Sequence, residues 1–250
     1  MTKINDEIVS MAKQFVSSLL MHETPDELVY HTIDHTRAVV KNAEFIGKKE
    51  NLNKDELRIL EVAAWFHDVG YLVKYAGHEE VSAKTAVEFL EKSNVNKESI
   101  DLVRQSILAT LLPQKPSSKI AGILCDADMM HLGTIEYFKL IDKLRKEWKK
   151  TDFKPLDKLK FEEASLELLE NHRYHTAYGR EVLQKEKDKN IEILKSRISE
   201  KQNKINRKEQ KKEKKSNSYS RGVDSMFKLT ARNQINLSSI ADNKSNILIS

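Results

Sequence analysis

Apolar residues recur at intervals of three and four along most of this 250-residue chain. The interval is clear in Ile4–Met21 and in Ile33–Lys49, and it matches the period of an α-helix with one buried face. Only seven glycines and four prolines interrupt the chain, and no Asn-Gly pair marks a β-hairpin turn. The sequence therefore predicts an all-α fold.

Further segments with the same period predict the remaining helices of this fold. They are Lys54–His67, His78–Lys92, Lys97–Leu111, Ser117–His131, Thr134–Lys149 and Leu156–Asn171. Asn53 and Glu56 have the spacing of a capping box at the start of the first of these. Gly70 and Gly77 bracket a short loop behind it.

The C-terminal part of the sequence has a different composition. From about Tyr174 the pattern indicates a long charged helix, with a polar, lysine-rich break at Lys211–Ser220. Between Lys195 and Arg221, eleven Lys and Arg residues accompany three Glu residues, a local charge of +8 in a chain of net charge +5. The rest of the chain is therefore mildly acidic. Few aromatic residues interleave the lysines, so nucleic acid is not an expected partner.

The long helix has two interpretations. A weak heptad fits a short coiled-coil stalk, which would make the protein a homo-oligomer, whereas a solvated single helix needs no partner. The heptad residues are Ile191, Leu194, Ile198 and Ile205. The expected domains are residues 1–185, a basic helix or linker at 186–219, and a distinct segment at 220–250.

The cysteine count and the hydropathy exclude several classes of protein. A single cysteine, Cys125, excludes an internal disulfide framework and a cysteine-based zinc site. Because it follows an apolar run, we expect a buried core residue rather than a nucleophile. The N-terminus has no signal-peptide pattern, and no stretch approaches about 18 apolar residues. The chain as given is expected to be soluble, in a reducing cytoplasm.

Several polar side chains lie where an apolar helix face would bury them. His67 and Asp68 end an apolar helix, and Asp128 follows another apolar run. His31 and His35 are one helical turn apart. Buried polar groups need partners, and imidazole nitrogens with carboxylate oxygens are ligands of hydrolytic divalent metal sites. The sequence therefore predicts a metal site with an open position for water.

The order His, His-Asp, Asp resembles the HD superfamily of metal-dependent phosphohydrolases over roughly residues 25–185. The resemblance implies a helical HD-domain bundle, and one divalent ion (Mn²⁺, Mg²⁺, Fe²⁺ or Zn²⁺) held by His35, His67, Asp68 and Asp128. Tyr30–Thr36 is also similar to a segment of cyclic-nucleotide phosphodiesterases, which implies that His31 donates a proton to the leaving oxygen. The implied substrate is a nucleotide or cyclic-nucleotide phosphoester.

The same resemblance suggests further site residues. Gly77–Ala83 resembles a segment that brings another histidine, here His78, close to the metal. Binuclear members have a histidine pair on the next helix, but Ile107–Leu112 contains none, which favours one metal. His78 is then a phosphate-binding or neighbouring group that joins His31 and Asp68 in the catalytic set. Additional candidate phosphate contacts are Lys41, Lys74 and Arg104.

Other polar residues have two interpretations each. Asp126 is the alternative to Asp128 as a ligand, and the residue that does not bind metal would be a helix cap or a hydrogen-bond partner. His131 is expected to be structural. The segment His172–His175 could contact a phosphate or form a polar joint between helices.

The last thirty residues carry a second resemblance. Ser220–Phe227, Thr230–Ser238 and Ile240–Leu248 resemble the entry to the membrane domain of Pycsar effectors, bacterial anti-phage proteins that respond to cyclic pyrimidine nucleotides. This implies the cytoplasmic part of an inner-membrane protein, cut off before a membrane region that follows residue 250. The basic segment Lys195–Lys215 would then lie near anionic lipid.

Two functions remain open from the sequence. One is a phosphohydrolase tethered to a membrane effector region. The other is a nucleotide-binding sensor with little turnover, whose occupancy controls that region through the long helix. The filled ligand set favours the enzyme over an inactive fold, but a metal can also bind a phosphate without cleaving it.

Overall fold

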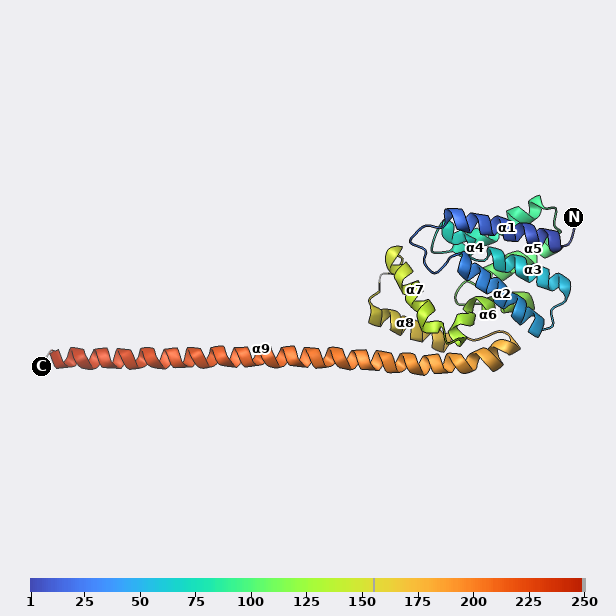
Figure 1. Cartoon of the computed structure of the whole chain (residues 1–250). Coiled ribbons are helices and arrows are strands. Elements are labelled where there is room, and N and C mark those ends of the chain that lie inside the picture. Colours follow the sequence, from blue (N-terminus) through green and yellow to red (C-terminus); the bar gives the residue numbers. More distant parts are fainter. Residues whose placement is uncertain (155, 249–250) are drawn as a thin grey trace. The chain divides into compact units, whose positions relative to one another are not determined.

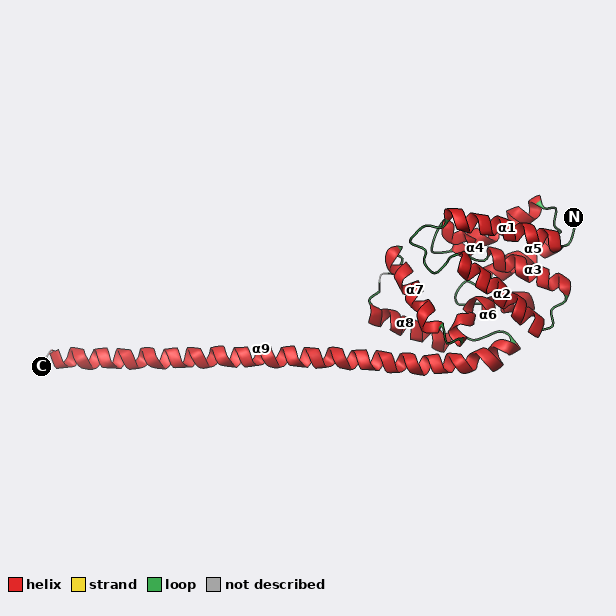
Figure 2. Ribbon diagram, in the orientation of Figure 1, coloured by secondary structure: helices red, strands yellow, loops and turns green. Residues whose placement is uncertain are grey.

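The computed structural model describes residues 1–154 and 156–248, with side chains described outside 215–220 and 236–248. These residues form helices joined by short loops and contain no β-strand (Figure 1, Figure 2). One isolated bridge joins Thr2 to Val95. The all-α prediction is confirmed. The chain divides into two compact units, Met1–Ser196 and Arg197–Ser250.

The helices begin and end close to the expected residues. α2 (Ile33–Lys49) and α4 (His78–Lys92) match their predicted ranges, and α3 (Lys54–Phe66) stops one residue earlier than predicted, so that His67 is its C-cap. The other elements are α1 (Asp6–Glu23), η1 (Val69–Leu72), α5 (Lys97–Leu108), α6 (Lys119–Asp128), η2 (Met129–Gly133), α7 (Tyr137–Lys150), α8 (Lys158–Asn171), η3 (Gly179–Leu183) and α9 (Gln184–Leu248).

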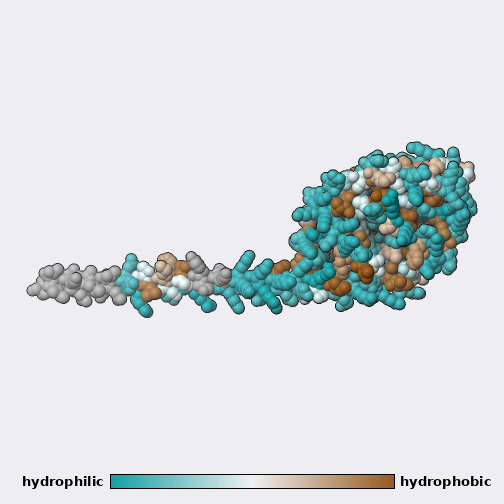
Figure 3. Space-filling model, in the orientation of Figure 1, coloured by the Kyte–Doolittle hydropathy of each residue, from teal (hydrophilic) through white to brown (hydrophobic). Residues whose placement is uncertain are grey.

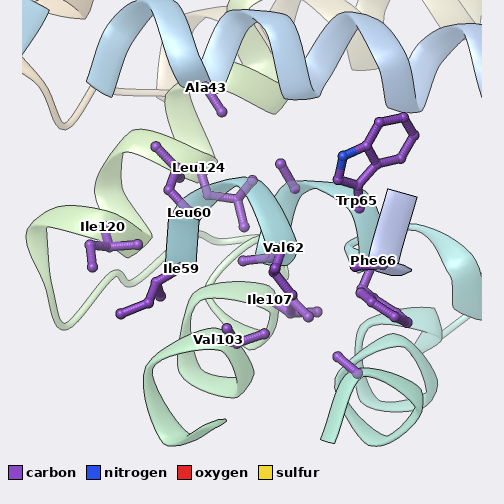
Figure 4. Close-up of a cluster of buried hydrophobic side chains, with 14 of the residues drawn as sticks. Ala43, Ile59, Leu60, Val62, Trp65, Phe66, Val103, Ile107, Ile120 and Leu124 are labelled. Atoms are coloured by element: carbon purple, nitrogen blue, oxygen red, sulfur yellow. The ribbon is translucent and has the colours of Figure 1, made fainter. Parts of the chain in front are cut away.

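Helix α3 is the centre of the first unit. Its N-terminus carries the capping box, since the Asn53 side chain accepts from two backbone N–H groups and Glu56 accepts from the Asn53 backbone. The helix packs against α1, α2, α4, α5 and α6. Figure 4 shows its apolar side chains between those of the neighbouring helices. The labelled residues are Ala43, Ile59, Leu60, Val62, Trp65, Phe66, Val103, Ile107, Ile120 and Leu124.

Because α3 is surrounded by other helices, the polar pair at its end is buried with it. His67 is fully buried and Asp68 is 7% exposed. Ionisable groups are rarely buried without partners, because water no longer solvates them. The fold therefore brings a histidine and an aspartate to the edge of its core, where other polar side chains must meet them.

Two glycines shape the segment behind this pair. A Cβ atom on Gly70 would lie 2.0 Å from the backbone oxygen of His78, so only glycine allows η1 to approach α4 this closely. The Gly70 N–H also donates to Ser82 Oγ at 2.8 Å. Gly77, before the first residue of α4, has a φ of 72°, which favours glycine. Both glycines thus help to place His78.

Helix α9 corrects one prediction. It is helical throughout Lys211–Ser220, so the expected break is wrong. That segment contains neither glycine nor proline, and Lys and Glu have high helix propensity, so polarity alone does not end the helix. Leu194 and Ile198 are buried, whereas Ile205 is 42% exposed.

The described side chains of α9 change in character along the helix. Figure 3 shows a hydrophilic surface over Lys201–Lys214, followed by a mixed surface over Arg221–Ile235. Exposed apolar residues in the second stretch are Val223, Met226, Phe227, Leu229 and Ile235. None of the helices among the described residues has an apolar stretch long enough to cross a membrane. The expected apolar end, Asn246–Ser250, lies outside the residues whose side chains are described.

Candidate metal centre

Four polar side chains meet where α2, α3 and α6 come together. His35 comes from α2, His67 and Asp68 follow α3, and Asp128 is the last residue of α6. Potential ligand atoms of His35, His67 and Asp128 all lie within 4.8 Å of one another. Asp68 Oδ2 lies 3.2 Å from the Nε2 atoms of both histidines. Asp128 Oδ1 lies 3.4 Å from His35 Nε2 and 3.8 Å from His67 Nε2. We call these four residues the ligand cluster.

The polar atoms of this cluster have the surroundings that a cation needs. The Nε2 atoms of His35 and His67 and Oδ2 of Asp68 are buried, and none has a hydrogen-bond partner among the described residues. His67 Nδ1 lies 2.8 Å from the Ala64 carbonyl oxygen, to which it donates, so its Nε2 lone pair faces the cluster. Buried polar atoms without partners are costly, and a divalent ion would provide the missing partner. The residues present therefore fit a metal.

The electrostatics of the cluster agree with this fit. Burial opposes a charge on His35, but the carboxylates of Asp128 and Asp68 outweigh it and raise the pKa of His35 to about 10. Burial likewise opposes ionisation of Asp68, yet the neighbouring histidines hold its pKa well below the usual range. The two buried carboxylates thus favour a positive charge at this point. A cation could take the place of protons on the histidines, because metal ligands must be deprotonated.

His78 lies beside the cluster rather than inside it. Its Nε2 is 3.5 Å from Asp68 Oδ1, the carboxylate oxygen that faces away from His35 and His67. Its Nδ1 lies 3.1 Å from the carbonyl oxygen of Tyr75 and can donate to it. The structure thus places His78 next to Asp68, and its role toward a metal or a phosphate stays a prediction.

Three rings stack next to the cluster. The Tyr71 ring lies between the imidazoles of His31 and His78, with centroids 3.8 Å and 3.7 Å away and interplanar angles of 20° and 22°. The His31 ring also meets the His35 ring at 5.7 Å. The stack holds two of the expected catalytic histidines against the ligand cluster. Sequence reasoning missed Tyr71, although an aromatic residue between Gly70 and Gly77 was a signal.

A buried carboxylate from α7 anchors this stack. Glu147 is fully buried and accepts from Nδ1 of His31, from the His31 N–H at 3.0 Å and from the Tyr30 N–H at 2.7 Å. The Tyr75 hydroxyl donates to it at 2.8 Å. Burial opposes its ionisation, but the bonds from His31 and Tyr30 outweigh it and lower the pKa of Glu147. Sequence reasoning missed it, although Glu147 follows Leu144 by three residues and so lies on the apolar side of its helix.

The structure separates the two aspartates at the end of α6. Asp126 accepts from the backbone of His175 at 2.8 Å, and from the backbone and hydroxyl of Thr176 at 2.8 and 2.7 Å. It is therefore the hydrogen-bond partner, while Asp128 joins the ligand cluster. Nearby Cys125 is buried and its thiol donates to the Ala109 carbonyl at 3.2 Å. Burial raises the pKa of this thiol, which fits a core residue.

The candidate phosphate contacts are not brought into the cluster. Lys41 and Arg104 are exposed on α2 and α5, with no ion pair or hydrogen bond to the ligand cluster among the described residues. Lys74 is exposed in the loop before α4, and its Nζ lies 3.5 Å from Glu80 Oε2. Of the three, only Lys74 is in the segment that carries Tyr71 and His78.

Two further histidines, His131 and His172, belong to the packing around η2 and α9. Burial lowers the pKa of His131 to about 4, and its Nδ1 lies 3.4 Å from the Tyr30 hydroxyl. Burial, with Lys187 nearby, lowers the pKa of His172 to about 3. Lys187 Nζ donates to the His172 carbonyl at 2.7 Å, so this segment has the contacts of a polar joint between α8 and α9.

Comparison with known proteins identifies the fold. Residues 32–133 match the family model described as the HD domain. No curated protein matches the chain. Similarity to solved structures at identities of 16–21% supports a shared fold and no more than the fold.

Three solved structures are similar to this chain. One, titled a predicted HD superfamily hydrolase from an uncultured Thermotogales bacterium, has a TM-score of 0.51 and 18% identity, covering 76% of this chain and 91% of that chain. A protein from Lactobacillus plantarum has a TM-score of 0.60 and 16% identity, covering 79% and 98%. Bacillus subtilis YpgQ, solved in complex with ADP, has a TM-score of 0.54 and 21% identity, covering 78% and 95%.

Proposed function

We propose that this chain is a metal-dependent phosphohydrolase that cleaves a phosphoester or phosphoanhydride of a nucleotide. The observation that carries the proposal is the convergence of buried, unpartnered Nε2 and Oδ2 atoms from His35, His67 and Asp68 on one point, with Asp128 beside them. Such a ligand set, drawn from three helices, leaves room for water and substrate. The HD-domain match over residues 32–133 also supports it.

Each residue of the site has a role in this reaction. His35, His67, Asp68 and Asp128 would hold the divalent ion, which would supply an activated water and neutralise phosphoryl oxygens. The water oxygen forms a bond to phosphorus while the bond to the leaving oxygen breaks. His31 gives its Nε2 proton to the leaving oxygen.

Two further steps complete the reaction. The proton lost by water passes to Oδ1 of Asp68, the carboxylate oxygen that faces His78. His78 contacts a phosphoryl oxygen, which its position at the edge of the cluster supports. The net change is one water consumed and one phosphorus–oxygen bond exchanged, because the proton that Asp68 gains balances the proton that His31 gives away.

The nucleotide part of the proposal has separate support. The Bacillus subtilis structure of the same fold was solved in complex with ADP. The cation would stand beside two imidazoles, of His31 and His78, which can bond phosphate oxygens. Linear and 3′,5′-cyclic nucleotides both fit this chemistry, so both belong in the test.

The test is release of phosphate or nucleotide product by the purified chain with Mn²⁺, Mg²⁺, Fe²⁺ or Zn²⁺, across linear and cyclic nucleotides. Turnover that requires the metal and falls at least about 10²-fold in Asp128→Asn supports the proposal. Asp34→Asn is the matched control, because this carboxylate is next to His35 but 90% exposed. No turnover with any metal, or equal loss in both variants, rejects the proposed activity.

A sensor is the second candidate. The buried ligand cluster could hold a metal-bound cyclic nucleotide without cleaving it, and the first turns of α9 contact η2, which directly follows Asp128. Asn190 donates to the carbonyls of Leu132 and Thr134 at 2.9 Å each. Retention of a cyclic pyrimidine nucleotide without product in the same samples would favour the sensor over the enzyme.

We also propose that the second unit connects this domain to a membrane, as in Pycsar effectors with an anti-phage role. The basic side chains of Lys204–Lys214, exposed along α9, support electrostatic attraction to anionic lipid. Exposed Met226 and Phe227 follow them and are suited to the lipid–water boundary. Self-association through α9 belongs to the same proposal.

A further inference from the structure

Glu147 lies outside every motif that the sequence and the family comparison identify. The HD-domain match ends at residue 133, and His31 stands one residue before its start. Yet the Glu147 carboxylate is fully buried and connects its own helix α7 to two other segments, which are the loop before α2 and, through Tyr75, the loop before α4. A buried carboxylate with this many donors holds a fixed position.

Each oxygen of Glu147 has a distinct set of donors. Oε2 accepts from the backbone N–H groups of Tyr30 and His31, which cannot change their hydrogen-bonding sense. Oε1 accepts from His31 Nδ1 and from the Tyr75 hydroxyl. The pairing with an ionised carboxylate requires a proton on His31 Nδ1. Nε2 is then the only ring nitrogen whose proton can leave.

The stack fixes the ring as well as its tautomer. Tyr71 lies 3.8 Å from His31 on one face, and the Tyr30 ring meets it edge-on at 4.8 Å. Rotation of the imidazole would break both contacts and the bond to Glu147. The ring of His31 is therefore held in one plane and one orientation beside His35.

We propose that Glu147 is a positioning residue for proton transfer: its Oε1 keeps the proton on Nδ1 of His31, so that Nε2 delivers its proton to the leaving oxygen. The inference rests on the proposed function. When both ring nitrogens carry protons, Nδ1–H stays with Glu147, Nε2–H moves to the oxygen as its bond to phosphorus breaks, and a neutral imidazole remains. An imidazole protonated only on Nε2 would have to become an imidazolate to do the same.

Substitution of Glu147 by Gln gives a sharp test. Two backbone N–H groups still require an acceptor at the Oε2 position, so the new NH₂ group must take the Oε1 position and face His31 Nδ1. A donor there forces Nδ1 to accept, which moves the proton of the neutral ring to Nε2. Glu147→Gln therefore exchanges the tautomer of His31 while nearly preserving shape.

The first readout is the ¹⁵N spectrum of the histidine side chains, with His31 assigned from the signals missing in His31→Asn. We expect the Nδ1–H tautomer in the native protein and the Nε2–H tautomer in Glu147→Gln. An Nε2–H tautomer in the native protein, or the same tautomer in both, overturns the inference. The native spectrum alone decides it if the variant fails to fold, and this readout does not depend on turnover.

The second readout compares two leaving groups. The substrates are a nucleoside phosphate and its 4-nitrophenyl ester, whose leaving phenolate needs no proton. For the unactivated substrate, kcat of Glu147→Gln should fall about 10²-fold or more with KM changed less than about three-fold. For the nitrophenyl ester the fall should be less than about ten-fold.

The control and the combined variant complete the design. Glu136 is the N-cap of α7 and its carboxylate is exposed. Glu136→Gln should therefore keep the native activity on both substrates. Glu147→Gln combined with His31→Asn should be no slower than His31→Asn alone. An equal fall on both substrates, or additive losses, overturns the inference even though the native enzyme is active. Native protein inactive on both substrates contradicts the proposed function, and the tautomer result then still decides the role of Glu147.

Discussion

At the scale of the residue, Asp126 and Asp128 have opposite surroundings although they are two positions apart. Donors from His175 and Thr176 surround Asp126. Asp128 instead faces His35 and His67. One carboxylate therefore holds the fold together, and the other is available to a cation.

This contrast gives a paired prediction. Asp126→Asn replaces one acceptor oxygen by a donor that faces N–H groups, and should lower the free energy of unfolding by about 1–3 kcal/mol while metal affinity stays within about three-fold. Asp128→Asn should lower metal affinity about ten-fold or more. Urea unfolding and calorimetric titration with Mn²⁺ measure the two quantities. Loss of metal binding in Asp126→Asn alone would reverse the assignment of the two residues.

His172 predicts a dependence of stability on pH. Burial, with Lys187 nearby, lowers the pKa of His172 from 6.5 to about 3. Between about pH 3 and pH 6.5 the unfolded chain therefore binds a proton at His172 that the folded chain does not. Stability should therefore fall as pH falls below 6.5, by up to about 1.4 kcal/mol per pH unit from this group. Unfolding in urea at several pH values measures it. His172→Gln should have a shallower dependence, and an unchanged slope would contradict the assignment.

Sequence alone could single out the residues of the ligand cluster, but not Glu147, which holds His31 beside it. His35, His67 and Asp68 stand out because imidazoles and carboxylates at the ends of apolar helices need partners. Glu147 is different, since it meets His31 across 116 positions of sequence. Helical periodicity tells which face of α7 is buried, but not which loop packs on that face.

At the scale of the element, the placement of α3 explains the site. The helix is surrounded on most sides, so its C-terminal pair is buried, and periodicity gave its ends to within one residue. The predicted break at Lys211–Ser220 is wrong, because polar residues alone do not end a helix and this segment contains neither glycine nor proline. The end of a helix depends on backbone geometry, and lysine and glutamate are compatible with helical backbone geometry.

The contact between η1 and α4 gives a prediction at this scale. In Gly70→Ala the new Cβ would stand 2.0 Å from the His78 carbonyl oxygen, so the two elements must separate. The free energy of unfolding should fall by about 1–3 kcal/mol, and turnover should fall because His78 moves. Gly222→Ala is the matched control, since no atom lies within 4 Å of the added Cβ and alanine favours a helix. Equal stability of the two variants in urea would contradict the close packing.

At the scale of the whole molecule, the chemistry and the charge belong to different units. The ligand cluster, the ring stack and Glu147 all lie within Met1–Ser196, while the excess of lysine follows in Arg197–Ser250. Unequal charge of this kind favours an anionic surface as the partner of the second unit. Net charge of the full chain, at +5, hides this division.

The membrane proposal is tested with vesicles and the full chain. We expect co-sedimentation with phosphatidylglycerol vesicles, weakening as salt rises, and little binding to phosphatidylcholine vesicles. Binding should be lost when glutamine replaces Lys208, Lys211, Lys212 and Lys214. It should persist when glutamine replaces four exposed lysines of α7, which are Lys139, Lys143, Lys146 and Lys149. Equal binding by both variants would reject α9 as the lipid contact.

Sedimentation velocity of the same samples tests self-association. A coiled-coil stalk predicts a dimer or larger oligomer whose population depends on concentration, and substitution of the exposed Ile205 by Asp should shift it toward the monomer. A concentration-independent monomer in the native protein would leave α9 as a solvated single helix.

Binding of one divalent ion by the ligand cluster is the claim on which the other functional inferences depend. The most direct measurement is titration of the metal-free chain with Mn²⁺. Binding is monitored by calorimetry and by the electron paramagnetic resonance signal of free Mn²⁺. We expect one tight site per chain in the native protein, at least about ten-fold weaker binding in Asp68→Asn, and unchanged binding in Asp34→Asn, with the same helical circular dichroism in all three. No tight site in the native chain, or the same affinity in Asp68→Asn, would contradict a metal centre at His35, His67, Asp68 and Asp128.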